Sequence, residues 1–258
     1  MSRIGRKFRD IRKDKGKAFI PYIMAGHPNI SRTKELVRLL EDCGADIIEL
    51  GVPFSDPLAD GPTIQRAAQL ALGEGVVMGR VIELVNTLRN TSDIPIVLMT
   101  YYNPIFKYVE ERFVHDASSA GVDGIIVPDL PPDEAGPLMT YSRKRGLDTI
   151  FLLAPTSTEE RIKKVSRASS GFIYYVSITG ITGSKLSIDA AIESHISRIR
   201  QETDKPVAVG FGISSPEEAS VVSGFADGVI VGSAIVKMVE NPDDSLREYL
   251  VSLRKAIG

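Results

Sequence analysis

The chain has 258 residues, of which 43% are hydrophobic and 25% charged, as in an ordinary globular protein that can bury a large core. The formal net charge of −2 provides no global field that would attract nucleic acid or an anionic membrane. A single cysteine, Cys43, excludes an internal disulfide bond, and no apolar run approaches the roughly 18 residues of a membrane span. We therefore expect one cytoplasmic domain over residues 1–258, with Cys43 as a buried structural thiol.

A basic stretch opens the sequence, and we interpret it as a short helix with a solvated face. After it, a short apolar run followed by an amphipathic helical stretch recurs eight times along the chain. Runs that are nearly continuous in apolar residues are typical of parallel strands covered on both faces. The expected strands are residues 18–25, 46–50, 94–101, 124–129, 149–154, 171–177, 206–210 and 228–232.

Between the expected strands, apolar residues recur at the spacing of one helix face. Ser31 and Thr158 are the expected N-caps of two of these helices. The apolar stripes are Leu36, Val37, Leu40 and Cys43; Val81, Leu84, Val85 and Leu88; Ile192, Ile196 and Ile199; and Leu246, Leu250 and Leu253. Strand alternating with helix eight times favours a (β/α)8 TIM barrel over an open sheet. The additional N-terminal helix has no partner strand and is expected to cover the barrel floor.

In such barrels, catalytic residues lie at the carboxyl ends of the strands and in the loops that follow. Glu49 interrupts the apolar second strand near that end. If it points into the barrel, burial raises the pKa of its carboxyl group and suits it to proton transfer near neutral pH. The alternative is an ion pair with a neighbouring strand, but no other strand interior supplies Lys or Arg. We therefore favour a functional role for Glu49.

The loop after this strand, residues 52–62, holds Asp56 and Asp60 among three prolines. Pro57 and Pro62 restrict the backbone, and Gly61 permits a turn. Loop aspartates usually cap turns, so the residues alone leave Asp60 open between turn formation and chemistry.

Glycine-rich segments follow the seventh and eighth strands and include Gly212, Gly232 and Ser233. Phosphate sites in these barrels commonly use these two loops, because glycines let backbone N–H groups approach an anion. A single Gly-x-Gly is equally consistent with a tight turn, but two such segments at these two strands favour a phosphate site. Neither segment contains Lys or Arg, so the expected donors are amides and hydroxyls.

Other chemistries find little support in the sequence. The three histidines are scattered and never paired at the spacing of metal ligands. No lysine interrupts a strand, as a Schiff-base aldolase would require, and no dinucleotide fingerprint follows the first strand. The loop after the sixth strand is rich in Gly and Thr, a composition that suits a mobile lid.

The segment over residues 49–62, ELGVPFSDPLADGP, resembles the signature of the tryptophan synthase alpha family, and the likeness extends along almost the whole chain. This resemblance implies a lyase that cleaves indole-3-glycerol phosphate to indole and glyceraldehyde 3-phosphate in tryptophan biosynthesis. The family's catalytic pair, a strand glutamate and a loop aspartate, corresponds to Glu49 and Asp60.

The resemblance also implies binding residues. Thr182 matches a threonine that helps to position the aspartate, and Tyr174 matches an active-site tyrosine, with the adjacent Tyr175 as the alternative. The implied phosphate contacts are Gly183, Phe211, Gly212, Gly232 and Ser233. The implied indole pocket is Tyr22, Met99, Ile126 and Leu152 or Leu153, which on sequence alone are ordinary core residues.

Finally, the resemblance implies a partner, the pyridoxal-phosphate-dependent β subunit in an αββα complex. This chain itself is expected to hold no cofactor and no metal. Asp56, Pro57 and Asn103 are expected at the barrel mouth and are candidates for the contact. The alternatives are another phosphosugar-binding barrel enzyme, against which the long acidic loop argues, and a non-catalytic regulatory subunit, against which the intact acidic pair argues.

Overall fold

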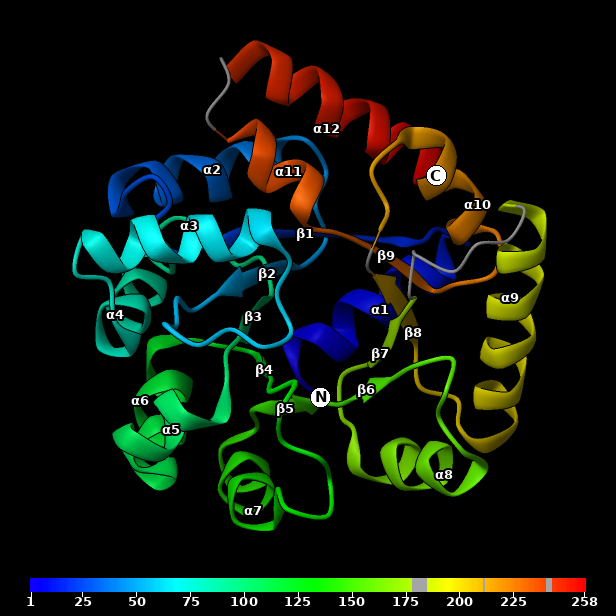
Figure 1. Cartoon of the computed structure of the whole chain (residues 1–258), viewed down its shortest axis with the longest axis horizontal. Coiled ribbons are helices and arrows are strands. Elements are labelled where there is room, and N and C mark those ends of the chain that lie inside the picture. Colours follow the sequence, from blue (N-terminus) through cyan, green and yellow to red (C-terminus); the bar gives the residue numbers. More distant parts are fainter. Residues whose placement is uncertain (178–184, 211, 240–242) are drawn as a thin grey trace.

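The computed structural model describes residues 1–177, 185–210, 212–239 and 243–258. Nine parallel strands form one sheet in the order β5-β4-β3-β2-β1-β9-β8-β7-β6. Only Phe151 separates β5 from β6 in the sequence, so the two ends of this order adjoin and the sheet curves into a nearly closed barrel. Figure 1 views this ring of strands with the helices arranged around it. The TIM barrel expected from the sequence is confirmed.

Each of the eight expected runs contains a strand, and the fifth run is divided into two short ones. The strands are β1 Ala18–Met24, β2 Ile48–Gly51, β3 Ile96–Met99, β4 Gly124–Ile126, β5 Asp148–Ile150, β6 Leu152–Leu153, β7 Ile173–Val176, β8 Val207–Gly210 and β9 Gly228–Val231. The helices are α1 Arg3–Lys13, α2 Ile30–Asp42, α3 Pro62–Gly73, α4 Met78–Leu88, α5 Tyr102–Tyr108, α6 Glu110–Ala120, α7 Gly136–Arg145, α8 Glu159–Ala168, α9 Lys185–Glu202, α10 Pro216–Ser223, α11 Ser233–Met238 and α12 Asp243–Ile257. None of these helices, as far as they are described, is long and apolar enough to cross a membrane.

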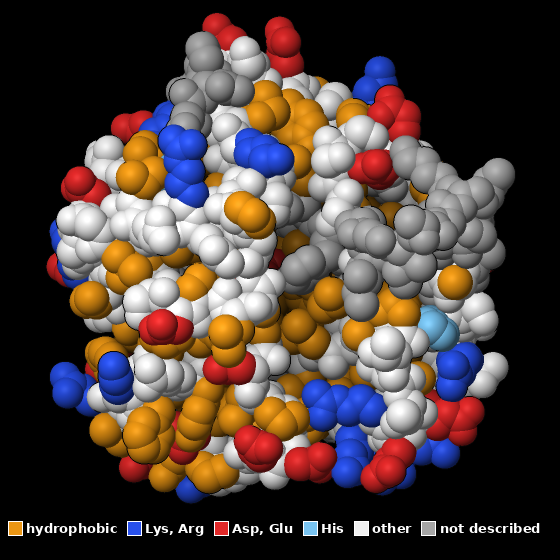
Figure 2. Space-filling model, viewed as in Figure 1, with side chains coloured by type: hydrophobic (Ala, Val, Ile, Leu, Met, Phe, Trp, Pro, Cys, Tyr) orange, Lys and Arg blue, Asp and Glu red, His pale blue; other side chains and the backbone are white. Residues whose placement is uncertain are grey.

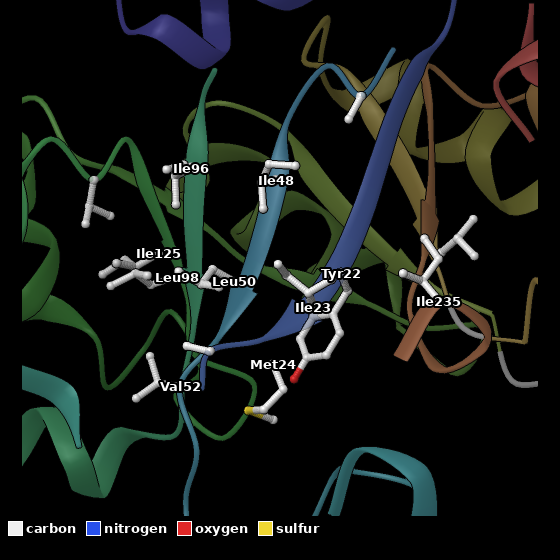
Figure 3. Packing of buried hydrophobic residues seen from close by; sticks show 14 of the residues in the cluster. Tyr22, Ile23, Met24, Ile48, Leu50, Val52, Ile96, Leu98, Ile125 and Ile235 are labelled. Atoms are coloured by element: carbon white, nitrogen blue, oxygen red, sulfur yellow. The ribbon is translucent and has the colours of Figure 1, made fainter. Parts of the chain in front are cut away.

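The outward faces of the strands pack against the helices. Ile23, Leu50, Leu98 and Ile125 are register partners on the successive strands β1 to β4 and are all buried. Figure 3 shows these side chains side by side across the strands. The four apolar helix stripes expected from the sequence are buried against this layer, as is Cys43. Because side chains alternate along a strand, the residues between them face the barrel interior.

The amino-terminal end of the interior is closed by α1. Ile4 and Phe8 are its buried residues, and the ring of Phe8 lies 5.7 Å from that of Phe172. Ile4 also lies so close to Gly124 that a Cβ there would be 2.9 Å from it. The expectation that this helix covers the barrel floor is confirmed.

Of the two N-caps expected from the sequence, one is correct. Thr158 accepts a hydrogen bond from the Arg161 N–H and caps α8. The expectation for Ser31 is wrong, because Asn29 caps α2 by accepting from the Arg32 N–H at 2.8 Å. Both residue types can cap a helix, so local preference did not decide between positions two residues apart.

Candidate active site

A cavity of about 450 Å³ opens at the carboxyl ends of the barrel strands. Figure 2 shows the molecule hollowed near the centre of the face seen in Figure 1. The residues that line the cavity are Tyr22, Glu49, Asp60, Gly61, Ile64, Met99, Tyr174, Gly212, Ile213, Ser214, Ile230, Gly232, Ser233, Ala234, Lys237, Met238 and Tyr249. Strands, the loop after β2 and the segments after β8 and β9 thus converge on one site.

Glu49 projects into the cavity from β2. Its side chain is 1% exposed, and neither carboxyl oxygen has a hydrogen-bond partner among the described residues. Burial, and then the neighbouring charge of Asp60, raise the pKa of Glu49 to about 8. A buried carboxyl group without partners favours its neutral form, so Glu49 carries a proton at neutral pH.

Asp60 enters the same cavity from the loop after β2. Burial raises its pKa to about 6, and a hydrogen bond from Tyr101 opposes that rise. Its carboxyl group is therefore mostly ionised at neutral pH. The site thus combines one neutral and one ionised carboxyl group, an arrangement that can donate a proton and stabilise a cation at the same time.

Local hydrogen bonds hold this loop. The Ala59 N–H donates to the Tyr101 hydroxyl at 2.9 Å, and the Gln65 side-chain amide donates to the Asp60 carbonyl at 2.8 Å. Helix α3 begins directly afterwards, with Pro62 in its first turn. Proline is favoured there because the first helical N–H has no partner within the helix. Asp60 is therefore fixed between a bonded loop and a helix start.

Two tyrosines each lie over a glycine that ends the neighbouring strand: Tyr22 of β1 over Gly51 of β2, and Tyr174 of β7 over Gly210 of β8. A Cβ on Gly51 would overlap the Tyr22 hydroxyl, and one on Gly210 would overlap the Tyr174 hydroxyl. Only glycine leaves room for these phenols inside the barrel. Burial, followed by nearby charges that include Glu49, raises the pKa of both phenols, so both are neutral hydrogen-bonding groups.

The structure distinguishes the two adjacent tyrosines of β7. Tyr174 lines the cavity. Tyr175 packs on the outer side of the barrel, where its hydroxyl lies 2.9 Å from Nδ1 of His195. The alternation of side chains along a strand places the two on opposite faces.

The apolar part of the cavity differs from the sequence-based expectation. Tyr22 and Met99 line it, but Ile126, the register partner of Met99, does not and is fully buried in the barrel interior. Leu152 and Leu153 are also absent from the lining. Ile64, from α3, is an apolar lining residue that the sequence did not predict. Its burial in an amphipathic helix gave no sign that it reaches a strand-end cavity.

Gly212, Gly232 and Ser233 also line the cavity, as expected from the sequence. Thr182, Gly183 and Phe211, which were expected beside them, fall outside the described residues. Lys237, in α11, also lines the cavity and was missed, since it lies four residues beyond the glycine-rich segment. Within the described part of the chain, no three His, Cys, Asp or Glu residues are grouped to hold a metal ion.

Comparison with known proteins places the chain in a family. The sequence profile described as "Tryptophan synthase alpha chain" matches residues 8–257. The chain belongs to the tryptophan synthase alpha chain family. A tryptophan synthase alpha chain from Geobacter sulfurreducens is 48% identical over 100% of both chains, and one from Geotalea uraniireducens is 50% identical over 97% of this chain and 94% of its own.

Solved structures agree. Tryptophan synthase subunit alpha from Legionella pneumophila superposes with a TM-score of 0.92 at 37% identity, covering 100% of this chain and 98% of its own. A chain of the aminoacrylate-bound tryptophan synthase from M. tuberculosis gives 0.91 at 37% identity, with 100% of both chains covered. The family assignment confirms the expected activity: the chain is a lyase of tryptophan biosynthesis that cleaves indole-3-glycerol phosphate.

Proposed function

We propose that Glu49 and Asp60 are the catalytic residues of this cleavage, performed by the chain as a single domain over residues 1–258. The observation that carries the proposal is the buried Glu49 carboxyl group, which has no hydrogen-bond partner among the described residues and shares a cavity with the ionisable Asp60. A structural carboxyl group buried to this degree would normally be paired, because an unpaired one destabilises the fold.

The chemistry needs one acid and one anion. The bond between indole C3 and the glycerol chain breaks readily only after C3 has been protonated, which leaves a cation on the ring. Glu49, neutral at first, donates this proton, while the Asp60 carboxylate accepts the indole N–H and stabilises the cation. The Glu49 carboxylate then takes the proton of the hydroxyl group whose carbon becomes the aldehyde. The electrons of the broken carbon–carbon bond return to the ring, and Glu49 ends protonated as it began.

The same cavity accommodates the rest of the substrate in our proposal. The phosphate lies against Gly212, Gly232 and Ser233, with Lys237 as a cation in the same lining. The indole ring lies on the side of Tyr22, Ile64 and Met99. The roles of Thr182, Gly183 and Phe211 rest on the family resemblance alone.

Two isosteric substitutions test the catalytic pair. Glu49→Gln and Asp60→Asn each keep the shape of the side chain but remove its acid–base function or its charge. We expect each variant to lose about 10²–10⁴-fold in kcat for indole release while retaining the parent's circular dichroism spectrum. Glu111→Gln, the same isosteric change at an exposed acid of α6 that does not line the cavity, serves as the control. Near-parental indole release by either folded variant would contradict the proposal.

We further propose that the chain works with a β subunit that carries pyridoxal phosphate, while this chain itself holds no cofactor. Relatives bear the name of an alpha chain, which implies a second kind of subunit. The loop after β2 presents a surface for it: Leu58 is 95% exposed, beside a pocket of about 340 Å³ lined by Phe54, Ser55, Asp56, Pro57, Leu58, Gln65 and Gln69. We also place the chain in the cytoplasm, a reducing compartment that suits its single free cysteine, Cys43.

A further inference from the structure

Tyr101 lies outside the residues assigned above, yet it contacts the catalytic loop at several points. It is buried, at 6% exposure, and immediately precedes α5, for which it serves as the N-cap residue. The end of β3 on one side and the first turn of α5 on the other therefore fix its backbone. Its phenol extends from this rigid junction towards the loop after β2.

The hydrogen bonds of the Tyr101 hydroxyl have a defined direction. The Ala59 N–H donates to the hydroxyl oxygen at 2.9 Å, and the hydroxyl is also hydrogen-bonded to the Asp60 side chain. An amide N–H can only donate, so the hydroxyl oxygen accepts from Ala59 and its own proton remains for the Asp60 carboxylate. A hydrogen bond to an ionised acceptor is about twice as strong as one between neutral groups.

The aromatic ring of Tyr101 provides a second contact to the same loop. Its centroid lies 5.5 Å from that of Phe54, at an interplanar angle of 35°. The ring thus meets the beginning of the loop and the hydroxyl meets its end. One side chain connects both parts of the loop to the barrel.

We propose that Tyr101 is a positioning residue that holds Asp60 in its ionised form in the cavity. This inference rests on the proposed role of Asp60 as the carboxylate that stabilises the protonated indole. Tyr101 acts only through Asp60 and does not line the cavity itself. Its hydroxyl orders the carboxylate before the substrate arrives, so that little reorganisation is needed during the reaction.

The charges around Asp60 determine what removal of the Tyr101 hydroxyl does. Burial raises the pKa of Asp60 to about 6, and the hydrogen bond from Tyr101 is the influence that lowers it. Without that bond the pKa of Asp60 rises, and a higher pH is required to ionise it. The other titratable groups that line the same cavity are Glu49 from β2, Tyr22 from β1, Tyr174 from β7, Lys237 from α11 and Tyr249 from α12.

The test compares Tyr101→Phe with Tyr102→Phe. The first variant removes the hydroxyl and keeps the ring. The second is a matched control, because the Tyr102 hydroxyl bonds to Glu110 at 3.1 Å and Tyr102 is not among the residues that line the cavity. We expect Tyr101→Phe to lower kcat at neutral pH by roughly tenfold or more and to change KM little. In the pH profile of kcat, the acid limb of Tyr101→Phe should move to higher pH. The acid limb of Tyr102→Phe should lie at the same pH as that of the parent.

A third variant separates hydrogen bonding from loop order. Phe54→Leu loosens the ring contact but keeps both hydrogen bonds of the hydroxyl, so its acid limb should coincide with that of the parent. The inference is overturned if Tyr101→Phe leaves the limb in place, or if Phe54→Leu moves it equally. The proposed role of Asp60 is tested independently of Tyr101: it is rejected if Asp60→Asn still cleaves the substrate. An inactive Asp60→Asn variant together with an unmoved limb in Tyr101→Phe would reject only the role of Tyr101.

Discussion

Two carboxyl groups in one cavity differ in charge because their surroundings differ. Glu49 is enclosed by the barrel and has no described hydrogen-bond partner, which raises its pKa to about 8. Asp60 lies in a less buried loop and receives a hydrogen bond from Tyr101, so its pKa is about 6. Titratable groups whose surroundings separate their pKa values are suited to separate acid and base roles.

This separation predicts a bell-shaped pH profile. Asp60 is ionised above about pH 6, and Glu49 is protonated below about pH 8, so both are in their working forms only between these values. We expect kcat/KM to be highest in that interval, to fall at lower pH as Asp60 is protonated, and to fall at higher pH as Glu49 ionises. Because the two groups interact, the two apparent values belong to the pair. A kcat/KM that keeps rising well above about pH 9 would contradict this assignment.

A second prediction at the residue scale concerns the phosphate. An added Cβ on Gly232 would meet only ordinary contacts, the nearest with Tyr22 at 3.6 Å. Gly232→Val should therefore fold but crowd the phosphate side of the cavity. We expect KM for indole-3-glycerol phosphate to rise by roughly tenfold, equivalent to ~1.4 kcal/mol of binding. Gly73→Ala, at an exposed glycine with open space around it, is the control. An unchanged KM would place the phosphate elsewhere.

At the scale of elements, the sequence predicted what depends on local pattern. Apolar runs and helical stripes repeat regularly enough to identify all eight strand positions, and the isolated acid in the second run singled out Glu49, which lines the cavity. The break at Phe151 between β5 and β6 depends on how the backbone pairs with both neighbours, which no local pattern contains. The choice of Asn29 over Ser31 as a cap likewise depends on where the preceding chain leaves the barrel.

The parts of the site that the sequence did not predict come from distant elements. Ile64, Lys237 and Tyr101 occupy helices or strand ends whose patterns are those of ordinary packing. Only the closure of the barrel brings Ile64 and Lys237 to the cavity that holds Glu49, and Tyr101 to the loop that carries Asp60. Ile126 was assigned to the pocket by resemblance; it is buried inside the barrel as the register partner of Met99 and is not among the described residues that line the cavity.

One arginine connects elements on the side of the barrel away from the site. Arg89 follows α4 and donates to the Gly121 carbonyl at 2.9 Å, to the Ile94 carbonyl at 2.7 Å and to the Asp123 carboxylate at 2.7 Å. Its side chain is 11% exposed and that of Asp123 is 6% exposed. The residue thus joins the entries to β3 and β4 through a nearly buried ion pair.

Breaking this connection should destabilise the fold without affecting the chemistry. Arg89→Met removes all of these donors and leaves Asp123 without its closest cation, so we expect the free energy of unfolding to fall by about 3 kcal/mol. Lys164→Met is the control, because its ion pairs with Asp133 and Glu160 are exposed and should contribute little. Urea unfolding followed by circular dichroism measures both changes, while kcat of the folded protein should stay at the parent value. Equal stability of the two variants would show that Arg89 is not the connection described.

In the whole molecule, one end of the barrel is closed by a helix and the other end opens into the cavity. The floor is closed by α1 through Ile4 and Phe8, so this end contributes to stability. The mouth holds the cavity, the acidic pair and the exposed tip of the loop after β2. Because Leu58 and Asp60 are two residues apart in that loop, an event at the outer surface can reach the Asp60 carboxylate through the backbone. The Tyr101 contacts to Phe54 and Ala59 lie on either side of this tip.

The last prediction concerns coupling between this surface and the cavity. If a β subunit covers the tip of the loop and favours the arrangement in which Asp60 is ordered, then β should increase cleavage by this chain, and substrate should by linkage increase the affinity for β. We expect purified β from the same source to raise the rate of indole-3-glycerol phosphate cleavage and to co-elute with this chain on a sizing column. Leu58→Asp should weaken both effects, since it places a charge on an apolar contact. Val251→Asp, on the exposed face of α12, should preserve them. If the parent chain is neither activated by β nor co-elutes with it, β is not its partner. If Leu58→Asp is activated as strongly as the parent at the same β concentration, the contact lies away from the loop tip.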